Sequence, residues 1–223
     1  MSDSQYTLYS YFRSSCSARL RIALNIKSIK YDMVYINLLK NEQLSDEHKA
    51  LNPSASVPVL INNTSKGTPF KVSQSVAALE YLEEKHPDTP MLPPTSDPEA
   101  RAMVRTLVNI VCVDIQPPTN LRIMRRVREL GGSAEEWNLQ LMTQGMAAYE
   151  NVAAGTAGKY SFGDEVTLAD VCLIPAIWGA QRFGVDLKAF PTISRIVENL
   201  KDHPAVIKAH WQNQQDTPEN LRA

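Results

Sequence analysis

The sequence predicts an α/β domain followed by an all-α domain, and three observations support this prediction. Apolar residues in the first third of the chain switch between the two-residue period of strands and the 3.6-residue period of helices. The remainder follows the helical period almost throughout. Between the two parts, five of the twelve residues 87–98 are proline, which favours neither helix nor strand. We therefore expect one domain over residues 1–87, a linker over 88–97 and an all-helical domain over 98–223.

The first domain is expected to have the element order βαβαββα. "YTLYSY" and "YDMVYINL" are rich in aromatic and β-branched residues, which is typical of strands, and "CSARLRIALNI" between them has the apolar period of a helix. A strand, a helix and a strand in this order form a right-handed crossover. A short helix over 44–51 then precedes two strands, which are joined by the polar loop 62–67 and followed by a helix in "QSVAALEYLEEKH".

Helix caps indicate the organisation of the second domain. Asp97 followed by Pro98 is typical of a helix start, because Asp is a favoured cap and Pro is favoured at the first helical position. Two capping boxes open further helices, at Ser133-Ala134-Glu135-Glu136 and at Thr167-Leu168-Ala169-Asp170. The last residues, "NQQDTPENLR", are too polar to pack alone and are expected to lie over the surface.

Composition excludes several classes of function. With 43% hydrophobic residues and a formal net charge of −1, the 223-residue chain can bury a core and lacks the basic excess of a nucleic-acid binder. The sequence has no basic N-terminal segment before an apolar run, and no window of roughly 20 apolar residues that could span a bilayer, so we expect a cytoplasmic protein. The three cysteines form no C-x-x-C pair and the four histidines never stand at i, i+4, so no metal is expected.

The most informative stretch is "LYSYFRSSCSARLRIALNI", residues 8–26. It places Ser14, Ser15, Cys16 and Ser17 at the start of a helix, where unpaired backbone N–H groups and the helix dipole favour an anion. The hydroxyls can donate hydrogen bonds to a sulfur anion, and arginines at positions 13, 19 and 21 add positive potential. A thiolate or a carboxylate is therefore expected here, and the thiol is either that of Cys16 or one carried by a ligand.

The same residues also have a purely structural interpretation. Serine is a good N-cap, and a small cysteine in the first turn of a helix can be a packing residue. On this motif alone the two interpretations carry equal weight. The other cysteines, Cys112 and Cys172, lie in apolar helical stretches and are expected to be inert core residues.

Two further stretches favour the interpretation as a binding site. Val57 precedes Pro58 at the first residue of a strand, where a cis bond and a tight turn would let Val57 present its backbone N–H and C=O groups to an extended ligand. Gln74 and Ser75 open the last helix of the first domain, which provides a second helix N-terminus able to hold a carboxylate. A turn proline and a plain cap explain each feature singly, but their order on this frame favours a common site.

Four segments, "SSCSARLRIAL", "NPSASVPVL", "QSVAALEYLEE" and "GDEVTLADVCLIP", together resemble the glutathione transferases, and the Ser-Ser-Cys form of the first is similar to the zeta class. The likeness extends over essentially the whole chain. It implies a thioredoxin-like N-terminal domain, glutathione as cofactor and a homodimer. It also implies the cis–trans isomerisation of maleylacetoacetate to fumarylacetoacetate, a step of tyrosine and phenylalanine catabolism, by addition of the glutathione thiolate, bond rotation and elimination.

The resemblance also implies roles for individual residues. Catalytic roles fall on Ser14, Ser15, Cys16 and Arg182, and contacts to substrate carboxylates fall on Arg13 and Arg182. Contacts to glutathione fall on Ser14, Ser15, Cys16, Ser17, Ala18, Arg19, Gln43, Val57, Pro58, Gln74, Ser75, Gln116, Asn120, Leu121 and Arg122. Arginine suits the substrate task because its planar guanidinium matches a carboxylate.

One departure from the zeta pattern bears on substrate preference. Where zeta members commonly carry Trp after Ser-Ser-Cys-Ser, this chain has Ala18. Two alternative functions stay open beside the isomerase: a zeta-class transferase acting on α-halo acids or peroxides, and a non-catalytic binding module of the same architecture. A second open question is whether Ser15 or Cys16 activates the thiol, because a reactive Cys16 could instead form a mixed disulfide with glutathione.

Overall fold

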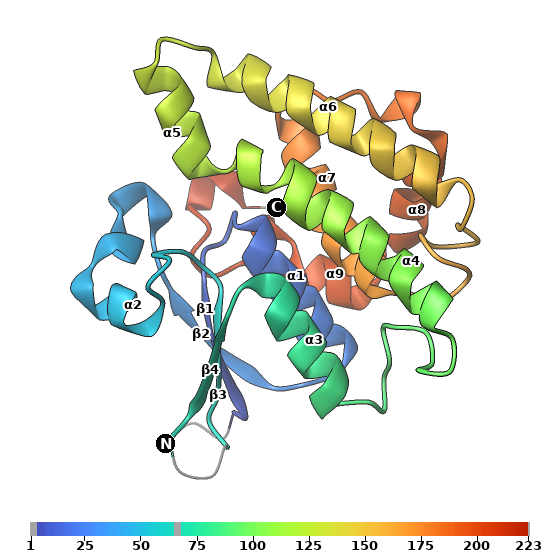
Figure 1. Cartoon of the computed structure of the whole chain (residues 1–223). Helices are drawn as coiled ribbons and strands as arrows, with labels where there is room; N and C mark the ends of the chain where they lie inside the picture. Colours follow the sequence, from blue (N-terminus) through green and yellow to red (C-terminus); the bar gives the residue numbers. More distant parts are fainter. Residues whose placement is uncertain (1–3, 65–67, 223) are drawn as a thin grey trace. The chain divides into compact units, whose positions relative to one another are not determined.

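The computed structural model describes residues 4–64 and 68–222. The chain divides into two compact units, one formed by Met1–Thr89 together with His203–Ala223 and the other by Pro90–Asp202 (Figure 1). The predicted division into residues 1–87 and 98–223 differs from this one at the C-terminal end, since residues 203–223 belong with the first unit. Part of the predicted loop over 62–67, residues 65–67, lies outside the described residues.

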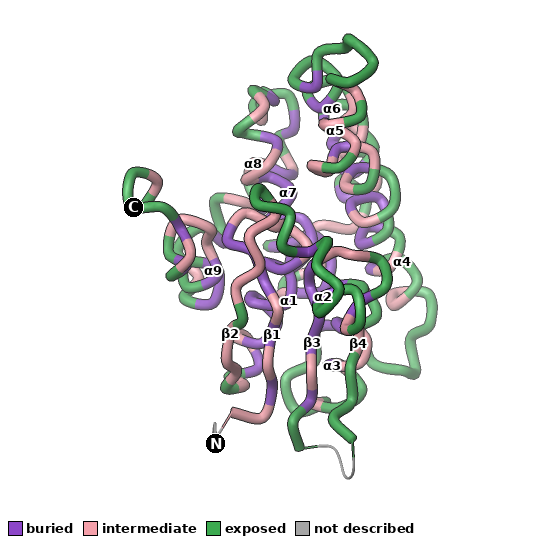
Figure 2. Tube along the Cα trace, turned by 90° about the vertical axis from the view of Figure 1, so that its left-hand side faces the viewer, coloured by how far each residue is buried: buried purple, intermediate pink, exposed green. Residues whose placement is uncertain are grey.

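The first unit is built on a four-stranded sheet. Its strands are β1 (Tyr6–Ser10), β2 (Tyr31–Tyr35), β3 (Val59–Asn62) and β4 (Phe70–Ser73), in the spatial order β2-β1-β3-β4 (Figure 2). The pair β1–β2 is parallel, while β1–β3 and β3–β4 are antiparallel. The central strands β1 and β3 are more buried than the edge strands β2 and β4, as Figure 2 shows.

Three helices complete the predicted order βαβαββα: α1 (Ser15–Ile26), α2 (Asp46–Leu51) and α3 (Ser75–Lys85). Helices α1 and α3 lie on one side of the sheet and α2 on the other (Figure 1). Burial of α1 is not confined to one stripe, because the short helix α9 (Pro204–Ala209) also packs against it. Leu20 and Leu24 are therefore fully buried together with Arg19 and Arg21.

A buried ion pair fixes the C-terminal ends of α1 and α3. Lys27 Nζ lies 2.7 Å from a carboxylate oxygen of Glu83, and both side chains are nearly inaccessible to solvent. The same ammonium donates to the carbonyl oxygens of His86 at 2.8 Å and of Thr89 at 2.7 Å. All three acceptors compensate the desolvation of the buried charge.

The C-terminal segment corrects the expectation that the last residues lie loosely over the surface. Gln214 is 5% exposed and Thr217 2% exposed. Gln214 Nε2 donates to the carbonyl oxygens of Lys208 and His210. Gln214 is buried here because its amide finds hydrogen-bond acceptors in the backbone that precedes the segment.

The second unit is helical, as predicted. It contains α4 (Pro98–Asn109), a π-helical segment (Ile110–Ile115), α5 (Leu121–Glu129), α6 (Ala134–Ala153), α7 (Leu168–Arg182) and α8 (Pro191–Leu200). Asp97 caps α4 with Pro98 at its first position, and Thr167 and Asp170 form the predicted capping box of α7. The sequence predicts that Pro117 and Pro118 interrupt the helix that begins at Pro98, but α4 already gives way to the π-helical segment at Ile110.

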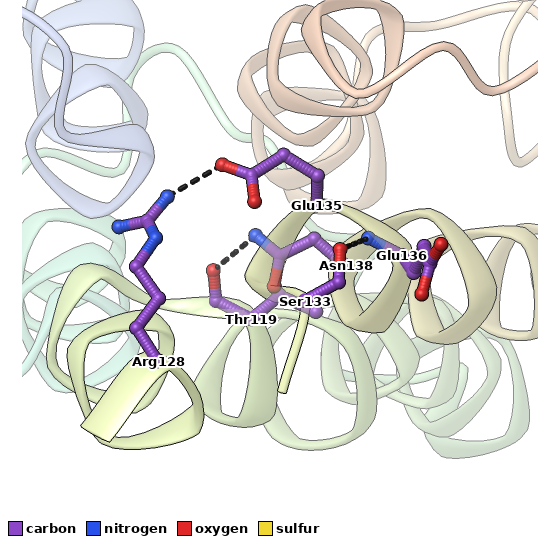
Figure 3. A network of polar contacts seen from close by, with 6 residues as sticks. All are labelled: Thr119, Arg128, Ser133, Glu135, Glu136 and Asn138. Carbon is purple, nitrogen blue, oxygen red and sulfur yellow. Dashed lines mark hydrogen bonds and ion pairs between the residues drawn. The ribbon is translucent and has the colours of Figure 1, made fainter. Parts of the chain in front are cut away.

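A polar network joins α5 to α6 (Figure 3). Arg128 and Glu135 form an ion pair at 2.5 Å, and this hydrogen bond lowers the pKa of Glu135. Buried Asn138 donates to the carbonyl oxygen of Thr119 at 3.0 Å. Ser133 Oγ accepts the backbone N–H of Glu136 at 3.1 Å, which is the first half of the predicted capping box.

One glycine in α6 is required by close packing. A Cβ atom on Gly145 would collide with the side chain of Ile115 in the π-helical segment. Across the described residues, we find no helix whose length and apolar character would let it span a membrane.

Candidate functional site

The predicted site begins at the turn between β1 and α1. The N–H of Ser14 donates to the carbonyl oxygen of Tyr11 at 3.0 Å, which closes the turn. Ser14 Oγ then accepts the N–H of Ser17 at 3.1 Å and so caps α1. The structural interpretation of Ser14 as a cap is therefore correct, while its hydroxyl hydrogen can still be donated to a ligand.

Two backbone N–H groups at this helix end are available to a ligand. The N–H of Ser17 is taken by Ser14 Oγ, and that of Ala18 by the Ser14 carbonyl at 2.9 Å. Within the described part of the chain, no acceptor is recorded for the N–H groups of Ser15 and Cys16. Their side chains are half-buried, so Ser15 and Cys16 combine free donors with access to solvent.

Ser17 and Ala18, two further predicted glutathione contacts, are buried, and their roles toward glutathione stay predictions. Ser17 is 0% and Ala18 1% exposed, because both face the interior of the first unit. Ala18, the residue that departs from the zeta pattern, thus lies on a buried part of α1.

Arg19 links the start of α1 to the start of α3. Its side chain is buried, and Nη1 donates to Ser75 Oγ at 2.9 Å. The same nitrogen lies 3.7 Å from Cys16 Sγ, where it can donate a weak hydrogen bond. The sequence predicted a cation here, but the contact to Ser75 joins residues 56 positions apart and has no local signal.

Arg13 and Arg21 are used differently from each other. The Arg13 guanidinium stacks over the Phe12 ring, 5.4 Å from its centroid, and the residue is half-buried. Arg21 is fully buried and donates to Ser10 Oγ and to the carbonyl oxygens of Tyr11 and Phe12. Burial lowers the pKa of Arg21 to about 10, so it stays a cation at neutral pH.

The N-terminus of α3 is the second anion-binding feature. Gln74 precedes the helix with φ 75° and ψ 118°, and no side chain of the described residues caps the helix there. Its first N–H groups, from Ser75 onward, are therefore available to an anion. A positive φ at a residue other than glycine costs about 1–3 kcal/mol, and such residues cluster at functional sites. No pattern in the sequence indicated this conformation of Gln74.

The third predicted feature of this unit is Val57, which lies two residues before β3. The Val57–Pro58 bond is cis, as the sequence suggested, and Val57 precedes β3 without joining its ladder.

Gln43 is only 9% exposed, and its side-chain oxygen has no hydrogen-bond partner among the described residues. An unpaired buried amide oxygen is costly, so Gln43 fits a ligand that donates a hydrogen bond.

The remaining predicted site residues lie in the second unit. Gln116 ends the π-helical segment and is half-buried. Asn120 caps α5: its Oδ1 accepts the N–H of Ile123 at 3.0 Å and its Nδ2 donates to the Pro117 carbonyl at 2.8 Å. Leu121 and Arg122 begin α5, and exposed Arg182 ends α7 with its guanidinium 4.7 Å from the Phe183 ring centroid. Their roles toward a ligand stay predictions.

Fold and site together define a class of protein. A βαβαββα unit carries two helix N-termini that can hold anions. In the same unit, the backbone of Val57 can form hydrogen bonds with an extended peptide. This arrangement suits a small anionic peptide with a thiol and carboxylates. No group of three or more potential metal-ligating side chains occurs in the described residues. The class is a thioredoxin-like peptide-thiol-binding domain joined to a helical unit.

Comparison with known proteins identifies the family. Residues 4–84 match the glutathione S-transferase N-terminal domain, and residues 135–204 match the glutathione S-transferase C-terminal domain. The chain is 56% identical over 218 residues to maleylacetoacetate isomerase maiA of Aspergillus fumigatus, covering 97% of this chain and 94% of that protein. The chain belongs to the glutathione S-transferase family, and the predicted resemblance is confirmed.

Solved structures agree with this assignment. A maleylacetoacetate isomerase from Anaeromyxobacter dehalogenans with glutathione in its active site is 39% identical, with a TM-score of 0.88 over 96% of this chain and 98% of that chain. A second structure of that protein, 38% identical and with the same TM-score and coverage, holds dicarboxyethyl glutathione and citrate in its active site. The thioredoxin-like and helical domains expected from the sequence are thus confirmed.

Proposed function

We propose that this protein catalyses the glutathione-dependent cis–trans isomerisation of maleylacetoacetate to fumarylacetoacetate. The observation that carries the proposal is the pair of helix N-termini, at Ser15 and at Ser75, in one unit with Val57, which lies outside the β3 ladder. Similarity over nearly the whole chain to a maleylacetoacetate isomerase supports the particular substrate.

Each part of the site fits one part of glutathione. The N–H groups and side chains of Ser15 and Cys16 would hold its sulfur, and Ser14 would add a hydroxyl donor. Val57 would pair with its cysteinyl backbone, and the start of α3 at Gln74 and Ser75 would hold its γ-glutamyl carboxylate. Gln43 would accept a hydrogen bond from glutathione through its buried side-chain oxygen, and Arg19 would hold Ser75 in place.

The chain's own residues would perform two tasks in the reaction. Bound glutathione supplies the nucleophilic thiolate that adds reversibly to the conjugated double bond and permits its rotation. Ser15 and Cys16 would stabilise the negative charge on sulfur before addition and after elimination. Arg13, already held against Phe12, would bind a substrate carboxylate, and the family resemblance assigns the same role to Arg182.

Titration calorimetry with glutathione followed by an assay with maleylacetone tests the proposal. We expect glutathione to bind and the trans product to form without net consumption of glutathione. Stoichiometric consumption would instead indicate a conjugating transferase acting on other electrophiles such as α-halo acids, and binding without turnover would indicate a non-catalytic module. An absence of heat on titration would contradict the cofactor assignment itself.

We also propose that the protein is a cytoplasmic homodimer, on the basis of the family resemblance. Sedimentation at micromolar concentration should give a particle of about twice the chain mass of 24.9 kDa. A particle with the mass of one chain would contradict the dimer.

A further inference from the structure

The C-terminal segment Trp211–Arg222 reaches the turn that presents the thiol-binding residues. This turn, Tyr11–Ser14, leads directly into Ser15 and Cys16 at the start of α1. Asp216 accepts the backbone N–H of Phe12 at 2.8 Å through Oδ2, across 204 positions of sequence. A carboxylate from the far end of the chain therefore contacts the turn three residues before Ser15.

The Phe12 peptide is held from both directions. Its N–H donates to Asp216, and its carbonyl oxygen accepts from Arg21 Nη2 at 3.0 Å. The other nitrogens of Arg21 donate to the carbonyl oxygens of Tyr11 and of Ala209, and the latter belongs to α9. Because Arg21 is completely buried, these bonds cannot be exchanged for water without exposing the core.

Apolar contacts extend the same attachment to the second part of the site. Tyr11, Phe12 and Val57 form a buried cluster, against which Trp211 and Leu221 of the C-terminal segment pack. Val57 is the residue proposed to pair with the backbone of glutathione. The C-terminal segment therefore contacts both the turn before the sulfur site and the residue that would bind the peptide.

The segment is itself held in a defined conformation. Thr217 Oγ1 donates to the Trp211 carbonyl, and Arg222 donates to the carbonyl oxygens of Thr217 and Gln215, both at 3.0 Å. The residues joined by these bonds lie both before and after Asp216 in the sequence. Its carboxylate is thus presented to Phe12 by a folded segment rather than by a flexible end.

We propose that Asp216 is a positioning residue for the thiol site, acting through the Phe12 N–H on the turn that carries Ser15 and Cys16, with Leu221 supporting the same turn and Val57. The proposal rests on the proposed function, since it assigns the geometry of the glutathione site to the C-terminal segment. For the hydrogen bond itself, an acceptor oxygen at this position satisfies the Phe12 N–H, while the carboxylate charge also interacts favourably with buried Arg21.

Three variants of the full-length protein test the acceptor role. Asp216→Ala removes the acceptor, and Asp216→Asn keeps an acceptor oxygen without the charge. Glu219→Ala removes a carboxylate from an exposed position of the same segment and is the control. The measurements are kcat at saturating glutathione, the Kd for glutathione, and the apparent pKa of the bound thiol followed by thiolate absorbance. The last measurement would not respond to a loss of global stability alone.

We expect Asp216→Ala to lower kcat by about 10-fold and to raise the apparent pKa of the bound thiol, because displaced donors stabilise the thiolate less. The kcat of Asp216→Asn should stay within about 3-fold of the wild-type value, and the kcat of Glu219→Ala should equal the wild-type value. Unchanged kcat and thiol pKa in Asp216→Ala would overturn the inference. So would an Asp216→Asn variant as impaired as Asp216→Ala.

Leu221→Ala provides a second route if Asp216→Ala does not fold. Leu221 is half-buried, and its truncation leaves the Asp216–Phe12 hydrogen bond in place. We expect its Kd for glutathione to rise at least about 3-fold, and an unchanged Kd would overturn the inference. Failure of the wild-type protein to bind glutathione would instead overturn the proposed function, and the inference with it.

Discussion

Two arginines of α1, Arg19 and Arg21, show how single residues shape the site. Each is buried, and each donates to oxygen acceptors far along the sequence: Ser75 for Arg19 and the Ala209 carbonyl for Arg21. Because water does not reach these guanidinium groups, each hydrogen bond that they make fixes the backbone or side chain that accepts it. Arg19 thereby connects the two helix ends proposed to hold glutathione.

Replacement of Ser15 by alanine tests the thiolate role at the residue scale. We expect Ser15→Ala to reduce turnover by at least about 10-fold, because a donor directed at the developing anion is lost. Steady-state kinetics with maleylacetone measures the effect, and Ser96→Ala, at an exposed position of the second unit, is the control. A turnover rate equal to that of the wild type would remove Ser15 from the site.

His86 predicts a dependence of stability on pH. Burial, followed by the charges of Lys27 and Lys85, lowers the pKa of His86, while Asp88 raises it. The unfolded chain therefore binds a proton near the usual value of 6.5 that the folded chain does not, so stability falls as pH decreases below this value.

The measurement is Tm as a function of pH. The wild-type Tm should decrease as the pH is lowered from about 6.5 to the lowered pKa of His86. The Tm of His86→Gln should decrease less over the same range. The pH profile of Tm for His203→Gln is the comparison, because His203 is a histidine with a different role, that of the N-cap of α9. Identical pH profiles for the wild type and His86→Gln would contradict the assignment.

At the scale of elements, the ends of α1 and α3 depend on the Lys27–Glu83 ion pair. Lys27→Met leaves the buried Glu83 carboxylate without its cation, and we expect a loss of about 3–5 kcal/mol in the free energy of unfolding. Urea unfolding measures this loss.

A double variant separates the ion pair from the packing around it. Lys27→Met combined with Glu83→Leu should recover part of the lost stability, because an apolar pair needs no charge compensation. The exposed pair of Lys201 and Glu198 is the control, where Lys201→Met should cost far less stability than Lys27→Met. Equal losses at the buried and the exposed pair would be inconsistent with this account.

At the scale of the whole molecule, the first unit is discontinuous in sequence. Residues 1–89 lack α9, the Ala209 acceptor of Arg21 and the Asp216 acceptor of Phe12. We expect the isolated fragment 1–89 not to unfold cooperatively. A fusion of residues 1–89 to 203–223 through a flexible linker should restore a cooperative transition, measured by circular dichroism during urea unfolding. A cooperative transition of fragment 1–89 alone would contradict the assignment of residues 203–223 to this unit.

Most of the fold, and the local part of the site, could be predicted from the sequence. The order βαβαββα follows from hydrophobic periodicity, and the caps at Asp97 and at Thr167 follow from interactions within one helical turn. The serines before α1 were predicted at a helix start for the same reason. Helix α3 ends at Lys85 and α4 begins at Pro98, on either side of the predicted linker 88–97, but proline content does not indicate which distant segment packs on which unit.

The sequence by itself thus determined the elements, their caps and the residue types at the two helix ends, since these depend on neighbours along the chain. Only the tertiary structure decided the positive φ of Gln74, the contact of Arg19 with Ser75, and the attachment of Asp216 to Phe12. The two contacts join positions 56 and 204 residues apart, and their hydrogen bonds compensate the cost of burying charged and peptide groups. No local pattern records such a pairing, because each partner alone is an ordinary arginine, serine or aspartate.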